Sequence, residues 1–248
     1  MTYLLCCSYS EFLKENNIVP SMCAGYSMGI YAAAYQAGSI SFEDGLFLIR
    51  NAFMEISKFT AGKKYGMGTV LGLSREDIIQ IMDEDSETIE IVNQNSPYSF
   101  IFSGSLEEIK KILDKARNEG ALNIRLLNVT IPYHSKLLEA TKEPFGAFIE
   151  SLSFKDPEIP IVSLIDQSVL KDSSALEKEI VRNLYTNLNW YYTQLQLQSS
   201  GVRSFIECGP GKTLVKNAKF VEGESRFYSV SSLFDSNITS SHQGLFEK

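Results

Sequence analysis

The pentapeptide Gly25-Tyr26-Ser27-Met28-Gly29 constrains this chain more than any other stretch of it. It has the G-x-S-x-G form of a nucleophile elbow, in which a serine sits on a sharp turn between a buried strand and a helix. Residues 19–24 before it are mostly apolar, as in a buried strand, and residues 28–36 after it are Ala-rich and favour a helix. These flanks favour an elbow over a chance match in a Gly/Ser-containing loop. Both glycines are expected to be required, because side chains there would collide as strand and helix close around Ser27.

A long helix is predicted over residues 42–60. Ser41 followed by acidic residues is typical of a helix start. Apolar residues recur at helical spacing along it, namely Leu46, Ile49, Phe53 and Ile56. Arg50 lies on this helix, and the residues alone leave open whether it is a surface arginine or part of a site.

From residue 63 the pattern changes to short strands and helices in the order β-α-β-β-α-β. The predicted strands are 67–73, 88–93, 98–103 and 123–129, and the predicted helices are 75–83 and 106–119. This order is the split βαβ pattern of a ferredoxin-like unit. We therefore predict an α/β fold in which a ferredoxin-like insert, residues 63–131, interrupts a core of residues 1–62 and 132–248. The predicted elements of the second core segment are helices 135–151, 175–187 and 190–199 and strands 160–165 and 203–208.

Composition narrows the classes of partner and compartment. The 248 residues carry a formal net charge of −7, which argues against nucleic acid as a general partner. An acidic protein could still dock on a local basic patch. The N-terminal stretch lacks the basic region of a signal peptide. The sequence has no run of 18 apolar residues, so no membrane span is predicted. The four cysteines show no metal-ligand spacing and read as reduced thiols, so a cytoplasmic location is expected.

A serine nucleophile needs a base, and the chain has two histidines. His242 lies in a Ser/Asn-rich tail and is a poor candidate. His134 lies between a predicted strand and a predicted helix, where loops of an α/β fold carry site residues. A helix-capping or packed histidine is the alternative, but with a credible elbow in the chain we interpret His134 as the base.

Six motifs in order along residues 4–232 resemble the malonyl-CoA:acyl-carrier-protein transacylases, the acyltransferases of fatty-acid and polyketide synthesis. The family's G-H-S-L-G is matched with Tyr26 in place of histidine, and its arginine helix is matched around Arg50. The other four matches are Asn93-Gln94-Asn95-Ser96-Pro97, Pro132-Tyr133-His134-Ser135, Arg182-Asn183-Leu184-Tyr185 to Trp190, and Glu207-Cys208-Gly209-Pro210-Gly211. The family fold is a hydrolase-like α/β core with a parallel sheet and a ferredoxin-like insert, in agreement with the pattern above.

The resemblance implies roles for individual residues. Ser27 would be the nucleophile and His134 its base, with the main-chain carbonyl of Asn183 orienting the histidine. Arg50 would hold the malonyl carboxylate through a bidentate pair, and the backbone N–H of Met28 would be an oxyanion donor. The implied reaction moves malonyl from malonyl-CoA to the phosphopantetheine thiol of an acyl carrier protein, without a metal or redox cofactor.

One departure from the family is large. Its first strand, which carries G-Q-G-S-Q and a second oxyanion donor, has no match in this sequence. We expect this strand to come from a longer start or a second polypeptide, and we expect impaired activity without it. Two alternatives to malonyl transfer stay open: a thioester hydrolase, in which water replaces the carrier thiol, and a non-catalytic homologue that binds carrier protein. Arg50 argues against the hydrolase, because an arginine favours a carboxylated acyl group.

Overall fold

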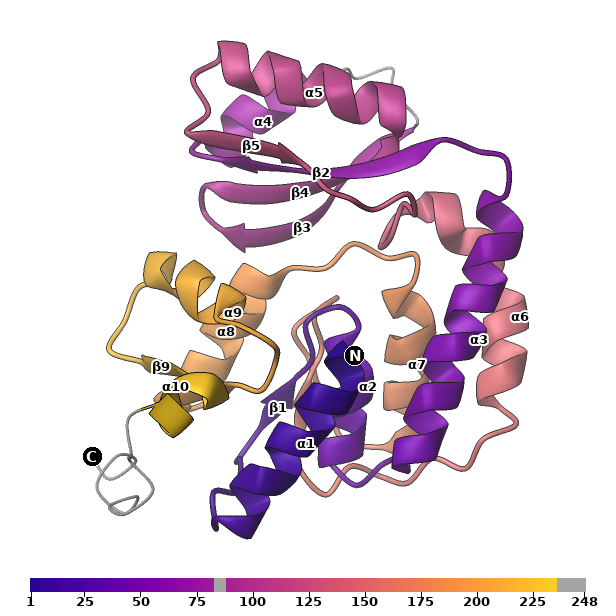
Figure 1. Cartoon of the computed structure of the whole chain (residues 1–248), viewed down its shortest axis with the longest axis vertical. Coiled ribbons are helices and arrows are strands. Elements are labelled where there is room, and N and C mark those ends of the chain that lie inside the picture. The colour runs from indigo at the N-terminus through magenta and orange to yellow at the C-terminus, as the bar shows by residue number, and fades with distance from the viewer. Residues whose placement is uncertain (83–87, 236–248) are drawn as a thin grey trace.

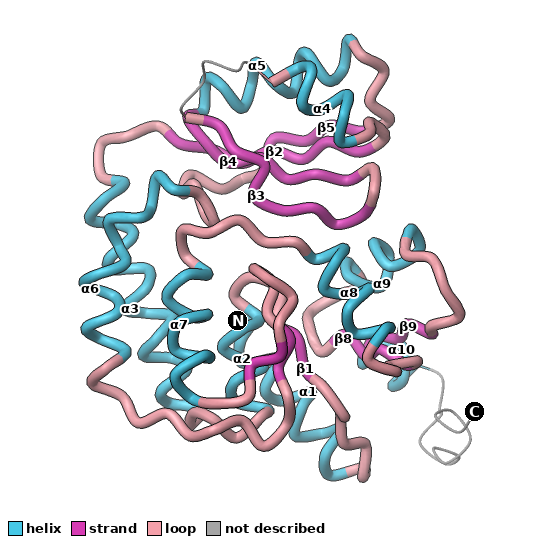
Figure 2. Tube along the Cα trace, turned by 180° about the vertical axis from the view of Figure 1, so that it is seen from behind, coloured by secondary structure: helices cyan, strands magenta, loops and turns pink. Residues whose placement is uncertain are grey.

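The computed structural model describes residues 1–82 and 88–235, and it has an upper and a lower part (Figure 1). The upper part contains one antiparallel sheet with helices on one of its faces. The lower part has a few short strands at its centre, with helices on either side, and Figure 2 shows the same division from behind. His242 lies outside the described residues.

We call the upper part the antiparallel unit. It comprises β2 (Tyr65–Leu71), α4 (Arg75–Ile81), β3 (Ile89–Ser96), β4 (Ser99–Ser105), α5 (Leu106–Asn118) and β5 (Asn123–Leu126). The strands lie in the order β3-β4-β2-β5, and each neighbouring pair is antiparallel. A core that includes Phe100, Phe102 and Ile109 joins the sheet to α5. The element order is the one that the sequence predicts for a ferredoxin-like unit.

The first segment of the lower part contains the elbow. Its elements are α1 (Thr2–Glu15), β1 (Cys23–Ala24), α2 (Gly29–Gln36) and α3 (Phe42–Thr60). Helix α3 begins where the sequence predicts, because Ser41 and Asp44 form a reciprocal capping box. Helix α2 is almost wholly buried, and alanines make up much of its contact with the surrounding core.

The second segment of the lower part returns after the antiparallel unit. Its elements are η1 (Lys136–Thr141), α6 (Lys142–Ile149), β6 (Ile161–Val162), β7 (Val169–Leu170), α7 (Ser173–Asn183), α8 (Trp190–Ser199), β8 (Ser204–Glu207), α9 (Thr213–Asn217), η2 (Ala218–Phe220), β9 (Arg226–Ser229) and α10 (Val230–Asp235). The sequence patterns did not predict β7, η2, β9 or α10. The helix expected over 135–151 is a 3-10 turn followed by a shorter α-helix.

The core sheet differs from the single parallel sheet that we expected. Among the described residues β1 pairs with β6 in parallel, β6 pairs with β7 antiparallel, and β8 and β9 form a separate parallel pair. Strand β1 has only two residues, although residues 19–24 were expected to be extended and paired. Pro20 has no N–H to donate to a ladder. Pairing starts at Cys23, whose N–H donates to the carbonyl of Pro160.

Helix α3 buries a different face from the one that its apolar spacing suggested. Its buried residues are Gly45, Leu48, Ala52, Glu55 and Ile56. Leu46 is 45% exposed and Phe53 is 58% exposed, so only part of the predicted stripe packs inward. In the described residues there is no helix of the length and apolarity that crossing a membrane requires.

Candidate active site

The elbow predicted at Ser27 forms a sharp turn between β1 and α2. Ser27 has a backbone φ of 52°, in the left-handed region that costs a non-glycine residue about 1–3 kcal/mol. The turn is closed by the N–H of Gly29, which donates to the carbonyl of Tyr26 at 2.8 Å. A Cβ on Gly25 would lie 2.3 Å from the backbone nitrogen of Ile30, whereas a Cβ on Gly29 would have no described heavy atom within 4 Å. The geometry therefore requires only the first of the two glycines.

Ser27 and His134, which are 107 residues apart in the chain, meet in the structure. The Oγ of Ser27 lies 2.7 Å from Nε2 of His134, and Nδ1 of His134 lies 2.5 Å from the carbonyl oxygen of Asn183. A carbonyl oxygen can only accept, so Nδ1 carries the ring proton and Nε2 presents a lone pair to the serine hydroxyl. This is the arrangement in which a histidine can remove a proton from a serine. The structure thus brings together three of the residues singled out in the sequence.

The loop that carries His134 is held by its backbone as well as by its ring. His134 has a φ of 63°, and its N–H donates to the carbonyl of Leu184 at 2.9 Å. The side chain is buried, and this burial lowers the pKa of His134 to about 4, although the hydrogen bond to Asn183 acts in the opposite direction. The imidazole is therefore neutral, and able to act as a base, over the whole neutral pH range.

This pKa predicts an unusual pH profile for the reactivity of Ser27. The base form of His134 is lost only as the pH falls through about 4, whereas an ordinary histidine loses it near 6.5. We expect the rate at which a fluorophosphonate probe labels Ser27 to stay level from neutral pH down to about pH 5 and to decline below that. Circular dichroism at each pH would show that the protein remains folded. A decline centred near pH 6.5 would contradict the burial of the imidazole.

A donor for a developing oxyanion is present beside Ser27. The backbone N–H of Met28 lies next to the nucleophile at the N-terminal end of α2 and donates to none of the described acceptors. Unsatisfied N–H groups at a helix start favour negative charge. The assignment of Met28 as an oxyanion donor stays a prediction that the geometry allows.

Arg50 makes none of the described hydrogen bonds to Ser27 or His134. It is exposed, and it lies on α3 between Leu48 and Ala52, both of which are buried. Residues two apart on a helix point to nearly opposite sides, so the Arg50 side chain faces away from the packed side of α3. Among the described residues it has no hydrogen-bond or ion-pair partner. A role for Arg50 in binding the acyl carboxylate stays a prediction that none of the described contacts tests.

The structure adds a polar network that the sequence patterns did not assign. The hydroxyl of Tyr26 lies between the side chains of Asn93 and Asn95 on β3. Glu90, also on β3, accepts hydrogen bonds from Ser135 and from the backbone of Lys136. Asn93 and Asn95 stand two apart in the motif Asn-x-Asn-Ser-Pro, and this spacing on a strand places both amides on one face. The spacing could have indicated that the two amides act together, but nothing in the sequence indicated that they bind the Tyr26 hydroxyl.

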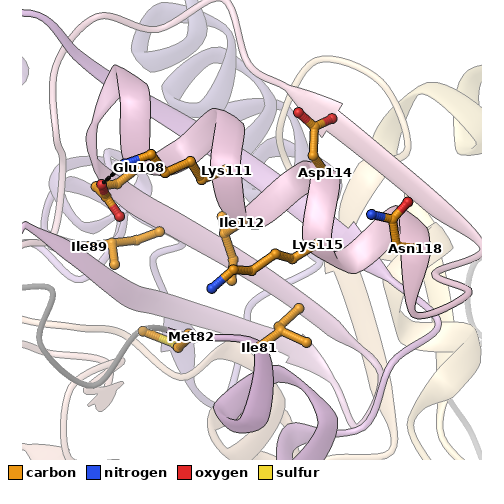
Figure 3. A pocket seen from close by; sticks show the side chains of 9 residues that line it. All are labelled: Ile81, Met82, Ile89, Glu108, Lys111, Ile112, Asp114, Lys115 and Asn118. Atoms are coloured by element: carbon orange, nitrogen blue, oxygen red, sulfur yellow. Dashed lines mark hydrogen bonds and ion pairs between the residues drawn. The ribbon is translucent and has the colours of Figure 1, made fainter.

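A cavity of about 480 Å³ lies elsewhere, in the antiparallel unit (Figure 3). Ile81, Ile89 and Ile112 contribute its apolar surface, and Lys111, which is paired with Glu108, and Lys115 are among its charged residues. None of the predicted site residues lines it. With charges of both signs around it, the cavity indicates no particular ligand.

Comparisons with known proteins find similar sequences and similar structures. The family model described as "Acyl transferase domain" matches residues 5–221. The malonyl CoA-acyl carrier protein transacylase of Bacillus subtilis (strain 168) is 27% identical over 224 residues, which are 89% of this chain and 71% of that protein. The structure of an acyl-carrier-protein S-malonyltransferase from Burkholderia pseudomallei 1710b superposes with a TM-score of 0.87 at 29% identity, over 94% of this chain and 78% of that one.

A further similar structure contains a carrier protein. It is a complex of a type II PKS acyl-carrier protein with its malonyl-transacylase, and it matches with a TM-score of 0.88 at 24% identity. The match covers 94% of this chain and 78% of that chain. At this identity the likeness shows a shared fold.

Proposed function

The chain belongs to the acyl transferase domain family, and from that premise we propose that it transfers a malonyl group from CoA to the phosphopantetheine thiol of an acyl carrier protein. The observation that carries the proposal is the contact between Ser27 and His134, with Asn183 holding the ring in the required tautomer. The relatives from Bacillus subtilis and Burkholderia pseudomallei are both named as malonyl transferases, which supports malonyl as the acyl group that is transferred. The complex of a structural relative with its carrier protein supports an acyl carrier protein as the acceptor.

The reaction proceeds in two halves at one serine. In the first half, Oγ of Ser27 attacks the thioester carbonyl carbon while Nε2 of His134 takes the hydroxyl proton. The backbone N–H of Met28 stabilises the oxyanion, the carbon–sulfur bond breaks, and the CoA sulfur leaves with the proton from His134. In the second half, His134 takes the proton of the carrier thiol, whose sulfur attacks the acyl-serine. The ester bond breaks, and Oγ of Ser27 recovers the proton.

The placement of Arg50 leads to a prediction about acyl choice. Loss of a desolvated ion pair costs about 3–5 kcal/mol, more than a hundredfold in rate, whereas an exposed charge contributes about 0–1 kcal/mol, at most about fivefold. If Arg50 pairs with the malonyl carboxylate away from water, we expect Arg50→Ala to lower the ratio of malonyl to acetyl transfer more than a hundredfold, whereas an arginine that stays a surface charge would change it less than fivefold. The measurement is kcat/KM for malonyl-CoA and acetyl-CoA with wild type and variant. Arg75→Ala, which removes an exposed arginine from α4, is the matched control.

The two outcomes of this measurement separate the hypotheses. A hundredfold collapse of the malonyl preference in Arg50→Ala alone is the result expected if Arg50 belongs to the site, and a change below fivefold would remove it. A wild type that uses acetyl-CoA as well as malonyl-CoA would overturn malonyl as the acyl group and leave the acyl transfer itself standing.

A thioester hydrolase is the second candidate, because water can cleave the same acyl-serine. The argument against the hydrolase is an arginine that favours a carboxylated acyl group, and this role of Arg50 is itself a proposal. The two activities differ in the fate of the acyl-serine, which either a carrier thiol or water cleaves. With malonyl-CoA and holo acyl carrier protein present together, transfer predicts malonyl-carrier protein as the main product. Free malonate as the main product would identify a hydrolase.

A further inference from the structure

Both residues of the catalytic pair have backbones that need support from their surroundings. Ser27 and His134 each have a positive φ, at 52° and 63°. Such conformations cost a non-glycine residue about 1–3 kcal/mol and persist where neighbouring structure over-determines them. For each residue, part of that support comes from the same element, strand β3 of the antiparallel unit.

On the elbow side, the contact runs through the residue that precedes the nucleophile. The hydroxyl of Tyr26 donates to Oδ1 of Asn95 at 3.0 Å and accepts from Nδ2 of Asn93 at 2.7 Å. Its ring packs edge-on against Trp190 with the ring centroids 5.4 Å apart. Burial raises the pKa of Tyr26 to about 12, so the hydroxyl keeps its proton and its donor role at neutral pH.

The orientation of the Asn93 amide is determined by a third partner. The backbone N–H of Trp190 donates to Oδ1 of Asn93 at 3.0 Å. Because a backbone N–H can only donate, the other end of the amide is Nδ2, and this end faces both the Tyr26 hydroxyl and Oδ1 of Asn95. Asn93 and Asn95 are buried, at 2% and 6% exposure, so the amides are fixed before any substrate arrives.

On the histidine side, the contact is a carboxylate. Oε1 of Glu90 accepts from the hydroxyl of Ser135 at 2.7 Å and from the N–H of Lys136 at 2.9 Å. Ser135 is fully buried and directly follows His134. Between these two anchors, the carbonyl of Val92 accepts from the N–H of Leu188 at 2.9 Å, so β3 is tied to the lower part along its length.

We propose that β3 is a positioning strand for catalysis, in which the Tyr26 hydroxyl and the Glu90 carboxylate hold Ser27 and His134 at reacting distance. The proposal rests on the proposed function only in taking Ser27 and His134 as the reacting pair. Tyr26 and Glu90 are positioning residues, because they act through the backbone beside the pair. A displacement of the pair by a fraction of an ångström weakens proton transfer without changing how the donor binds.

The test on the elbow side compares two tyrosine hydroxyls. Tyr26→Phe keeps the ring against Trp190 and removes only the hydroxyl. Tyr35→Phe, the matched control, removes a hydroxyl on α2 that donates to Glu11 at 3.0 Å and touches neither β3 nor the catalytic pair. We expect Tyr26→Phe to lower fluorophosphonate labelling of Ser27 and kcat at least tenfold with KM within twofold of wild type. For Tyr35→Phe, the labelling rate, kcat and KM should each stay within twofold of wild type. Labelling by Tyr26→Phe at the wild-type rate would overturn the elbow half of the proposal.

The test on the histidine side uses rescue by a conservative variant. Glu90→Ala removes both hydrogen bonds to the His134 loop, whereas Glu90→Gln keeps one side-chain oxygen that can accept from Ser135 or Lys136. We expect at least a tenfold loss of labelling in Glu90→Ala and recovery of most of that loss in Glu90→Gln. Melting temperatures above the assay temperature exclude unfolding as the cause. A Glu90→Ala protein that labels like wild type would overturn the histidine half.

Failure of the proposed function remains distinguishable from failure of this inference. The fluorophosphonate reports the reactivity of Ser27 and needs neither CoA nor a carrier protein. A wild type that labels rapidly but transfers no acyl group overturns the acyl transfer, and the comparison of Tyr26→Phe with Tyr35→Phe still decides the role of β3.

Discussion

Replacing Ser27 by alanine is expected to abolish the covalent acyl-enzyme. Oγ of Ser27 is the atom that Nε2 of His134 contacts at 2.7 Å, and alanine has no nucleophile in its place. The measurement is the intact mass of the protein after incubation with malonyl-CoA, in which wild type should gain one malonyl group and Ser27→Ala none. Ser151→Ala, which removes an exposed hydroxyl bonded only to the Phe148 carbonyl, should acylate like wild type. An adduct that persists in Ser27→Ala would show that the nucleophile is another residue.

His134→Ala belongs to the same experiment, with a graded result. A positioned general base contributes about 10²–10⁴ in rate, so acylation of this variant should be slower by that factor while Ser27 remains the acylated residue. The buried imidazole also fills space, and thermal unfolding of the variant separates loss of the base from loss of the fold. Acylation at the wild-type rate in folded His134→Ala would remove the histidine from the mechanism.

The two glycines of the elbow are expected to respond very differently to alanine. A Cβ on Gly25 would lie 2.3–2.4 Å from backbone atoms of Gly29 and Ile30, which cannot rotate away as a side chain would. Overpacking costs about 1–3 kcal/mol even where side chains can adjust, so Gly25→Ala should lose roughly 10 °C or more of melting temperature, or fail to fold. Its Ser27 should no longer react with a fluorophosphonate, because strand and helix can no longer close around the turn.

Gly29→Ala is the matched control for that experiment. Its Cβ would meet no described atom, and Gly29 is not among the residues with positive φ. Replacing glycine at such a site leaves stability unchanged or raises it by about 0.4–1 kcal/mol. Differential scanning fluorimetry and probe labelling of both variants measure the contrast. A Gly25→Ala protein as stable and as reactive as Gly29→Ala would contradict the close approach of β1 and α2.

Sequence patterns predicted most accurately those features that depend on residues close together in the chain. Ser41 and Asp44 predict the start of α3 because a capping box involves only neighbouring residues. The order of elements in the antiparallel unit follows from periodicity and turn residues, and the structure has that order. The strand over residues 19–24 was predicted too long because pairing depends on a partner, and β1 meets β6 over only two residues.

Arg50 shows why the sequence could not assign every candidate. Helix α3 has large apolar residues on opposite sides, since Leu48 and Ile56 are buried while Phe47 and Phe53 are exposed. Apolar periodicity then fits more than one inward face, and only the packing of α2, η1 and α6 against α3 selects one. With that face packed inward, Arg50 is exposed.

The sequence by itself determined the elbow and its chemistry. A glycine where two backbones approach, a serine at the turn and an Ala-rich helix after it specify the turn between strand and helix. Only the tertiary structure decided which groups meet there. It brings Nε2 of His134 to Ser27, the carbonyl of Asn183 to Nδ1, and the amides of Asn93 and Asn95 to Tyr26, across separations of 107, 49 and, for the two amides, 67 and 69 residues. The physical reason is that hydrogen bonds between distant segments depend on how whole elements pack, and no local pattern encodes that packing.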